Sequence, residues 1–194
     1  MGRRRAFDTE EAIRAARGVF WSQGFETASL PALEGATGLS ASSIYNAFGS
    51  KRGLFDAAVA SYLDEIARPR LRPLTGAHVE PGALVGYLTG LRAALTSPDA
   101  LPARAGCLLI NSAGAPIGGD EAIADAVAAY CQELRAALGN GVRARLSEGE
   151  AAACETLADV CAGLVVAAFA VVRVDPRQAA RFVDAACSLV AQKG

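Results

Sequence analysis

Helix start and stop signals recur along almost the whole chain, and they constrain its fold more than any other feature. Ser and Asp residues suited to capping stand before apolar residues spaced three and four apart, and Gly or Pro follows most of these runs. No stretch alternates apolar and polar residues long enough to predict a strand, and no internal repeat is visible. The pattern predicts an all-α protein of about nine helices.

The first four expected helices each have a cap residue and a stop residue. These pairs are Asp8 and Gly24, Ser29 and Gly38, Ser40 and Gly49, and Ser50 and Pro69. A Pro- and Gly-containing loop is expected over 69–82. Five further helices are expected over 82–96, 103–113, 120–138 and 147–174, and from the Asp175–Pro176 pair onward.

Composition and hydropathy favour a protein that folds in the cytoplasm without a membrane partner. The chain has 194 residues, of which 52% are hydrophobic, so it can bury a sizeable core. No apolar segment of a secretory signal follows the basic start. The longest apolar run, 160–172, is shorter than the ~20 residues that a membrane-spanning helix needs.

The positive charge is concentrated near the N-terminus. Residues 1–55 carry seven Lys and Arg against five Asp and Glu, whereas the remainder is mildly acidic. Arg3, Arg4 and Arg5 form a basic arm that can contact an anionic partner such as DNA, or can simply be solvated. A protein that coats DNA without specificity would need many more basic residues than this chain carries.

The five cysteines include no CxxC pair, and the single histidine, His78, lies in a Pro- and Gly-containing loop. In an intracellular chain such cysteines are expected to be reduced and buried. We therefore expect no metal, no cofactor and no catalytic residue. A redox-switched regulator or a thiol enzyme on a helical scaffold is the alternative, and native thiol titration would distinguish it.

The segment "SASSIYNAFGSK" places polar residues where a helix of the core would not need them. Ile44 and Phe48 share one face, while Ser42, Ser43, Tyr45 and Asn46 point elsewhere. The helix over 29–36, the "TGLS" turn and the helix over 41–48 together predict a helix-turn-helix motif. The second helix of such a motif enters the DNA major groove, which places Ala41, Ser42 and Ser43 at the bases.

Two cations follow the Ser50 cap directly. Lys51 and Arg52 occupy the positive end of the expected fourth helix, where each is unfavourable by roughly 0.3–1 kcal/mol. A phosphate would compensate both cations and bind the free amide groups of that first turn. The sequence therefore predicts a phosphate contact at Lys51.

The segments "AARGVFWSQGFETASLPAL" and "GLSASSIYNAFGSKRGLF" resemble the TetR family of bacterial repressors over about the first 55 residues. The resemblance implies a DNA-binding domain over 1–50 and a ligand-binding and dimerisation domain over 51–194. It also implies that Thr27 and Ser29 contact phosphates, that Ala41, Ser42 and Ser43 hold the base-reading positions, and that Tyr45 and Lys51 contact the groove wall and a phosphate. The helix-turn-helix motif places Asn46 at the groove wall with Tyr45, and Ser40 is expected among the DNA-binding residues. Glu34 departs from the small residue of many members, and Gly53 departs from an acidic one, which leaves Lys51 and Arg52 less compensated.

The all-round apolar character of the helix over 147–174 predicts a homodimer, because such a helix must be buried on every side. The final helix offers a second apolar stripe, so two such pairs would form a four-helix interface. The expected interface residues are Gly163, Ala167, Ala170, Phe182, Val183, Ala186, Leu189 and Val190.

The segment "GCLLINSAG" resembles a motif of a subgroup of the same family. Its Asn111 either makes a structural hydrogen bond to a neighbouring helix or orients a ligand. We expect a cavity for a small apolar effector, bounded by Leu63, Tyr87, Leu91, Cys107, Leu108, Asn111 and Phe169. The resulting hypothesis is a repressor that binds a pseudo-palindromic operator as a homodimer and is released by that effector.

Overall fold

The computed structural model describes residues 8–146 and 151–192, and all regular secondary structure in these ranges is helical, with no strand. The all-α prediction is confirmed. The chain forms two compact units, Met1–Ile66 and Ala67–Gly194. The predicted boundary between a DNA-binding and a ligand-binding domain, at residues 50 and 51, concerns function and stays a prediction.

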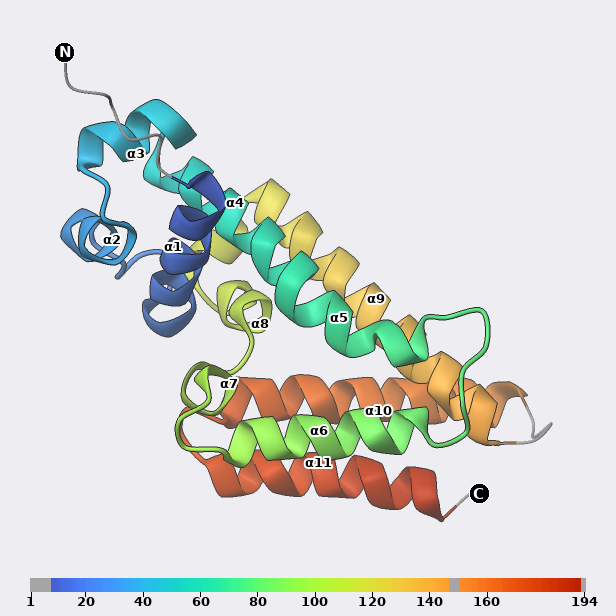
Figure 1. The fold of residues 1–194 in the computed structure, drawn as a ribbon. Coiled ribbons are helices and arrows are strands. Elements are labelled where there is room, and N and C mark those ends of the chain that lie inside the picture. The colour runs from blue at the N-terminus through green and yellow to red at the C-terminus, as the bar shows by residue number, and fades with distance from the viewer. Residues whose placement is uncertain (1–7, 147–150, 193–194) are drawn as a thin grey trace. The chain divides into compact units, whose positions relative to one another are not determined.

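The N-terminal unit contains four α-helices and most of a π-helical turn (Figure 1). They are α1 (Thr9–Gln23), α2 (Leu30–Thr37), α3 (Ala41–Phe48) and α4 (Lys51–Tyr62), followed by the π-turn η1 (Leu63–Ala67). The predicted caps Asp8, Ser29, Ser40 and Ser50 each accept a backbone N–H from the first turn of the helix that follows. Gly38 ends α2 in the left-handed conformation, with φ of 69°.

Aromatic rings hold these helices together. The Phe55 ring of α4 lies 5.1 Å from the Phe20 ring of α1 and 5.1 Å from that of Phe25, measured between centroids. Trp21 and Tyr62 make an edge-on contact at 4.8 Å. This core fixes α1 against α4 and supports α2 and α3.

The second unit is a larger helical bundle. Its elements are α5 (Arg68–Leu71), η2 (Arg72–Leu74), α6 (Ala83–Thr96), α7 (Leu101–Ala105), α8 (Leu108–Ala113), η3 (Pro116–Gly119), α9 (Glu121–Arg145), α10 (Ala151–Val171) and α11 (Pro176–Ala191). Helix α11 packs on both α6 and α10, and α9 packs on α10 and α8 (Figure 1). Arg135 and Arg143 of α9 form ion pairs with Glu155 of α10 at 2.6 and 2.8 Å.

Several helix bounds differ from the sequence prediction. Pro69 does not end the fourth helical segment, because the π-turn leads into α5 and the proline occupies the first turn of α5, where it removes no needed hydrogen bond. The segment expected as one helix over 103–113 is two, α7 and α8, separated at Gly106 with φ of 67°. The predicted capping box at Ser147 and Glu150 lies outside the described residues.

Helix α9 continues past the glycines that were expected to stop it at residue 138. A Cβ atom on Gly141 would lie 2.8 Å from side-chain carbons of both Leu74 and Leu84. Glycine at this position therefore permits close packing of α9 on η2 and α6, and that packing outweighs the helix-breaking tendency of Gly.

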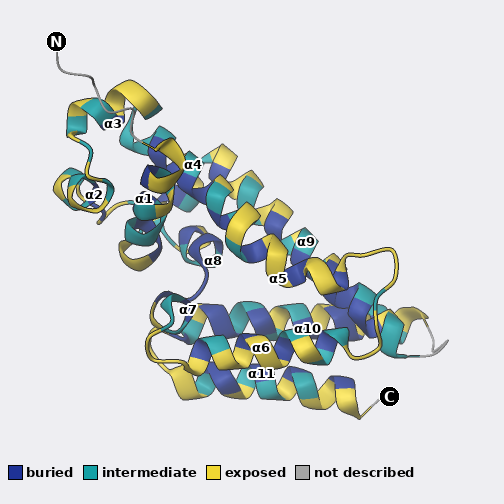
Figure 2. Ribbon diagram, in the orientation of Figure 1, coloured by how far each residue is buried: buried dark blue, intermediate teal, exposed yellow. Residues whose placement is uncertain are grey.

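Helix α10 is long and apolar enough to cross a bilayer by length and composition, although its uninterrupted apolar run, 160–172, is shorter than a membrane-spanning helix needs. It is a bundle helix here: Cys161, Val165 and Ala168 are fully buried against the unit's own core. Its ion pairs to α9 also tie its first half to a neighbouring helix. Other positions of α10, among them Val160, Gly163 and Ala170, are exposed, and Figure 2 marks further exposed positions in yellow on the neighbouring helices α6 and α11.

Candidate functional site

The exposed face of α3 is polar and uncharged. Ile44 is fully buried and anchors the helix, while Ser42, Tyr45 and Asn46 are exposed. Tyr45 has 44% of its surface exposed and is one of few large apolar side chains so placed. The predicted inward and outward faces of this helix therefore agree with the observed burial. Thr27 and Ser29, at the start of α2, are exposed as well.

Three serine hydroxyls meet at the N-terminus of α3. The Ser40 Oγ atom accepts the backbone N–H of Ser43 at 3.3 Å. It also lies 2.9 Å from the Ser42 hydroxyl and 3.0 Å from that of Ser43. The predicted base-reading serines are thus held by the cap residue in the free protein. On binding DNA, these serine hydroxyls can give up their contacts with one another and form hydrogen bonds with a base. No buried polar atom is then left without a partner.

Glu34 takes part in the same helix start. Its Oε1 atom accepts the backbone N–H of Ala41 at 2.5 Å, across the turn between α2 and α3. From the sequence, Glu34 is recognisable only as a departure from a small residue. A contact seven residues away across a turn has no periodic signature, so the sequence could not reveal it.

Lys51 and Arg52 also have partners inside the protein. The Lys51 ammonium lies 4.7 Å from the centre of the Phe25 ring and 3.5 Å from the Glu26 carbonyl oxygen. The Arg52 Nε atom donates to Asp56 at 2.7 Å. Both cations are nevertheless only partly buried, and Lys51 retains donors for an external anion.

Gly53 has a steric explanation. A Cβ atom at this position would collide with the carbonyl oxygen of Phe48. The first turn of α4 therefore follows α3 too closely for the acidic residue that the family resemblance implies.

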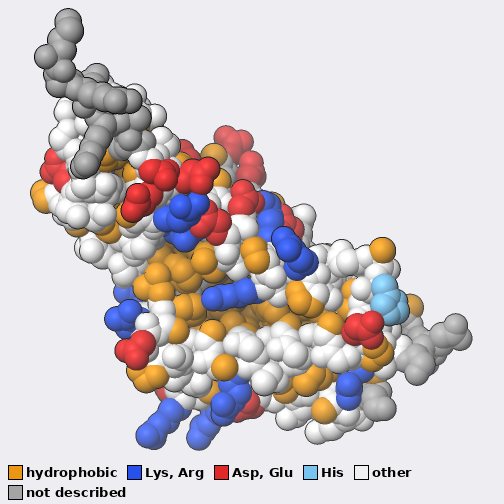
Figure 3. Space-filling model, viewed as in Figure 1, with side chains coloured by type: hydrophobic (Ala, Val, Ile, Leu, Met, Phe, Trp, Pro, Cys, Tyr) orange, Lys and Arg blue, Asp and Glu red, His pale blue; other side chains and the backbone are white. Residues whose placement is uncertain are grey.

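Arg3, Arg4 and Arg5 lie outside the described residues. On the face shown in Figure 3, Lys and Arg side chains lie among Asp and Glu side chains and form no continuous basic patch.

The residues predicted to line an effector cavity are largely buried. Leu91, Cys107, Leu108 and Phe169 belong to the core of the second unit, and Tyr87 and Asn111 are half-buried. The Asn111 amide donates to the Ala105 carbonyl oxygen at 2.5 Å, so the structural hydrogen bond is present. Leu63 belongs to the N-terminal unit.

Tyr87, Cys107 and Cys131 interact within the second unit. Burial raises the pKa of the Tyr87 phenol, and the neighbouring Cys107 raises it further, whereas Arg70 lowers it. Burial also raises the pKa of the Cys131 thiol, again with a contribution from Cys107. Cys131 is not among the predicted lining residues, because nothing in the spacing of the cysteines connects it to Cys107.

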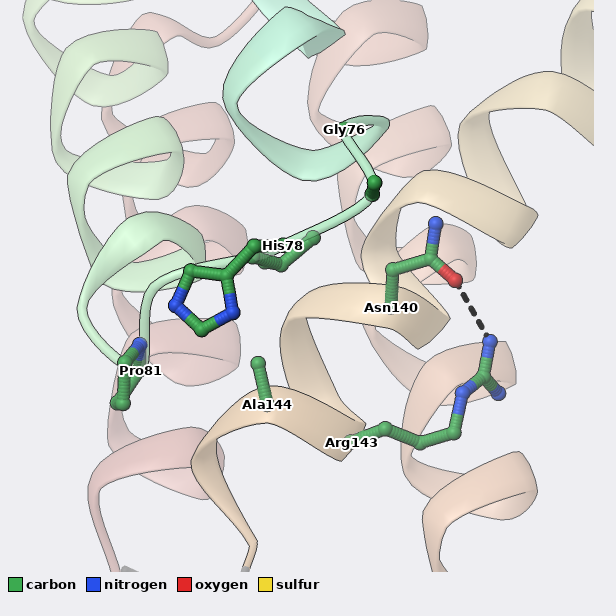
Figure 4. Close-up of a pocket in the computed structure, with 8 residues that line it drawn as sticks. Gly76, His78, Pro81, Asn140, Arg143 and Ala144 are labelled. Atoms are coloured by element: carbon green, nitrogen blue, oxygen red, sulfur yellow. Dashed lines mark hydrogen bonds between the residues drawn. The ribbon is translucent and has the colours of Figure 1, made fainter.

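Two pockets of the second unit lie elsewhere. One, of about 460 Å³, opens between the loop after η2 and the end of α9 (Figure 4) and is lined by Gly76, Ala77, His78, Val79, Pro81, Asn140, Arg143 and Ala144. The other, of about 340 Å³, is lined by Arg68, Leu71, Thr75, Glu133, Ala136, Ala137 and Asn140. Neither includes a residue of the predicted effector cavity.

The polar groups of the pocket in Figure 4 already have partners. Asn140 donates to the Leu74 carbonyl oxygen at 2.9 Å and accepts from Arg143 at 2.8 Å. Arg143 also pairs with Glu155, and His78 lies 3.3 Å from Glu80. Within the described ranges no cluster of three His, Cys, Asp or Glu side chains could hold a metal ion.

The predicted dimer residues divide into two groups. Gly163, Ala170 and Leu189 are exposed, and Ala167 and Phe182 are half-buried. Val183, Ala186 and Val190 are buried inside the protomer, and their assignment to a dimer surface is wrong. Val183, Ala186 and Val190 are spaced three and four residues apart, and this side of α11 faces the core of its own unit. The exposed side of α11 is therefore the neighbouring one, which contains Phe182 and Leu189.

Helices α2 and α3, joined by a short turn and with the second helix exposed, have the arrangement of a helix-turn-helix motif, which is typical of DNA-binding regulators. The family is more specific. Residues 12–58 match the model of the "Bacterial regulatory proteins, tetR family", and the chain is 31% identical over 150 residues to the uncharacterised regulator YezE of Bacillus subtilis, covering 76% of it. The chain belongs to the TetR family of transcriptional regulators.

Other relatives agree. The repressor ComR of Escherichia coli is 36% identical over 113 residues, an alignment that spans 57% of this chain but only about half (52%) of ComR. A structure of the TetR-family regulator CifR, a cysteine mutant complexed with a 26-base-pair operator DNA, superposes with a TM-score of 0.78 at 31% identity, covering 96% of this chain and 98% of that one. The SCO4454 regulator of Streptomyces coelicolor, at 16% identity and a TM-score of 0.77, shares the fold.

Proposed function

We propose that this regulator is a repressor that binds a pseudo-palindromic operator as a homodimer and is released by a small, mainly apolar effector. The observation that carries the DNA-binding part is the α3 face, where polar side chains surround an exposed tyrosine on a helix anchored by one buried isoleucine. A stability-driven surface helix would carry charged pairs instead.

In this proposal α3 lies in the major groove. Ala41, Ser42 and Ser43 meet base edges, Tyr45 and Asn46 meet the groove wall, and Lys51 meets a phosphate. Thr27, Ser29 and Ser40 contact the backbone through their hydroxyls, as does the basic arm of Arg3, Arg4 and Arg5. Short hydroxyl side chains offer little bidentate base reading, so DNA shape contributes much of the specificity. The structure of CifR with operator DNA supports the DNA-binding role of this chain by similarity.

The dimer forms through the outward stripes of α10 and α11. Gly163, Ala167 and Ala170 let a second helix approach closely, and Phe182 and Leu189 supply apolar area. The two headpieces then read half-sites roughly 34–36 Å apart. An effector held by Tyr87, Leu91, Cys107, Leu108, Asn111 and Phe169 favours a different headpiece spacing, with a coupling of about 1–3 kcal/mol.

The thiol-based alternative gains no support. Burial raises the pKa of Cys161 to about 11, and it raises the pKa of Cys131 and Cys187 as well. These three thiols therefore stay protonated near neutral pH and are poor nucleophiles. We therefore propose a DNA-binding regulator of the cytoplasm, without a cofactor or a catalytic residue, and not a thiol enzyme.

The test is a pair of substitutions measured on an operator selected from random duplex DNA. Tyr45→Ala removes a rigid groove contact and should weaken operator binding more than it weakens binding to scrambled DNA. Lys51→Ala removes one phosphate contact, so it should weaken both and reduce the log K against log salt slope by about 1.

Lys51→Met is the matched control for the lysine, because it keeps an apolar stem beside Phe25 while removing the charge. Its salt slope should equal that of the alanine variant. If Tyr45→Ala and Lys51→Ala both bound the selected operator like the wild type, the placement of α3 in the groove would be refuted.

A further inference from the structure

The start of α3 is held by two different side chains. Ser40 caps it in the usual way, from the residue just before the helix. Glu34 adds a second cap from α2, through the 2.5 Å bond from the Ala41 N–H to its Oε1 atom. A carboxylate acceptor makes a shorter and stronger bond than a neutral one, and its charge is favourable at a helix N-terminus.

The first-turn donors of α3 are almost all used. Ala41 donates to Glu34, Ser43 to the Ser40 Oγ atom, and Ile44 to the Ser40 carbonyl oxygen at 3.0 Å. The remaining first-turn amide is that of Ser42, on the exposed side where base contacts are proposed. The helix therefore cannot turn about its axis or slide toward α2 without breaking a charge-assisted bond.

Little else fixes α3 at this end. Ile44 is the single fully buried side chain of the helix, and it lies in its middle. The hydroxyl contacts among Ser40, Ser42 and Ser43 are internal to the helix start and hold nothing to α2. With one buried side chain in the middle of a short helix, rotation of that helix is resisted chiefly by hydrogen bonds from its ends to other elements. At the start of α3 this is the bond from the Ala41 N–H to Glu34.

We propose that Glu34 is a positioning residue for DNA recognition, which fixes the N-terminal turn of α3 against α2 and so sets how sharply the protein discriminates its operator from other DNA. This inference rests on the proposed placement of α3 in the groove. The acid touches no base: it acts through Ala41 on the position of Ser42 and Ser43. Its negative charge at the DNA-facing end also disfavours binding that relies on phosphates alone.

Two substitutions separate position from charge. Glu34→Gln keeps a side-chain oxygen that can accept the Ala41 N–H and removes the charge, whereas Glu34→Ala removes both. Discrimination is the ratio of dissociation constants for scrambled and selected operator DNA. It should fall about tenfold in the alanine variant, as expected for the loss of one charge-assisted hydrogen bond, and stay within about threefold of wild type in the glutamine variant.

Glu11→Gln is the matched charge control, because Glu11 is an exposed acid of α1 whose side chain makes no described bond to α3. It should leave discrimination unchanged. Amide hydrogen exchange supplies a readout that needs no DNA: Ala41 should exchange faster in the alanine variant than in the glutamine variant, with Phe20 and Phe55 unaffected.

The outcomes separate this inference from the proposed function. If Tyr45→Ala weakens operator binding but Glu34→Ala keeps wild-type discrimination, Glu34 is only a structural cap and the inference is overturned. The same holds if Ala41 exchange is unchanged in Glu34→Ala. If Tyr45→Ala has no effect, the groove placement itself is wrong, whatever Glu34 does.

Discussion

At the scale of single residues, charges in the N-terminal unit are organised around Glu65. Arg17 donates from Nη1 to the Glu65 Oε2 atom at 2.9 Å and to the Ser61 hydroxyl at 2.7 Å. Arg14 donates from Nε to the same carboxylate at 3.1 Å. These bonds join α1 to the turn after α4, next to the Trp21–Tyr62 contact. The pairs are separated by about fifty residues in sequence, so no local pattern could have predicted them.

The Glu65 network predicts an acid-sensitive contribution to stability. Hydrogen bonds from Arg17, and then Arg14, hold the pKa of Glu65 below its usual value. A carboxyl with a lowered folded-state pKa stabilises the protein above its unfolded pKa of about 4.3, and that contribution is lost as the pH falls through the folded value.

Glu65→Gln should therefore lower the free energy of unfolding at pH 7 and flatten its decline below about pH 4.5. Denaturant unfolding followed by the fluorescence of Trp21, the single tryptophan, measures this in the N-terminal unit. Glu11→Gln serves again as the control and should keep the wild-type decline. An identical acid limb in Glu65→Gln and wild type would show that the network contributes nothing.

At the scale of helices, the sequence predicted the ends that depend on local chemistry. The caps at Asp8, Ser29, Ser40, Ser50 and Asp175 all form, because a cap needs only its own side chain and the next turn. The ends that depend on packing were predicted wrongly. Helix α9 continues through Gly139 and Gly141, because its packing on neighbouring helices outweighs the tendency of Gly to end a helix. Packing also determines which side of α11 faces the core, and there Val190 is buried.

The packing of α9 gives a prediction at the same scale. Gly141→Ala should destabilise the second unit by roughly 1–3 kcal/mol, because the added methyl group would overlap with Leu74 and Leu84. Gly90→Ala in α6 is the matched control, since a Cβ atom there meets nothing within 4 Å. It should be neutral or stabilise by up to about 1 kcal/mol through helix propensity. Thermal unfolding followed by circular dichroism measures both, and equal effects of the two substitutions would contradict the packing argument.

At the scale of the whole molecule, the exposed apolar stripe of α10 and α11 is the feature that a protomer alone does not explain. Val160 is 41% and Leu189 is 36% exposed, and they lie on the helices that carry Gly163 and Phe182. Stable interfaces bury ~1,200–2,000 Å² and have apolar centres, a description that two facing helix pairs can meet. The sequence indicated this surface from the apolar character of α10, but not which side of α11 belongs to it.

Gly163→Arg tests the dimer and its link to DNA binding. Gly163 is exposed, and a Cβ atom there meets nothing within 4 Å, so one protomer accommodates the arginine without strain. Across a close helix–helix contact the same side chain would place a charge in an apolar interface. Gly90→Arg is the matched control, because it adds the same residue at another open helical glycine outside the stripe.

The wild type and Gly90→Arg should sediment as dimers at micromolar concentration, and Gly163→Arg as a folded monomer. Operator affinity should fall about 100-fold or more in the monomer, because its headpiece binds one half-site without the effective concentration that a tethered partner supplies. Its affinity for a single half-site should be unchanged. A wild type that is monomeric, or a Gly163→Arg variant that remains dimeric, would show that the exposed stripe serves another purpose.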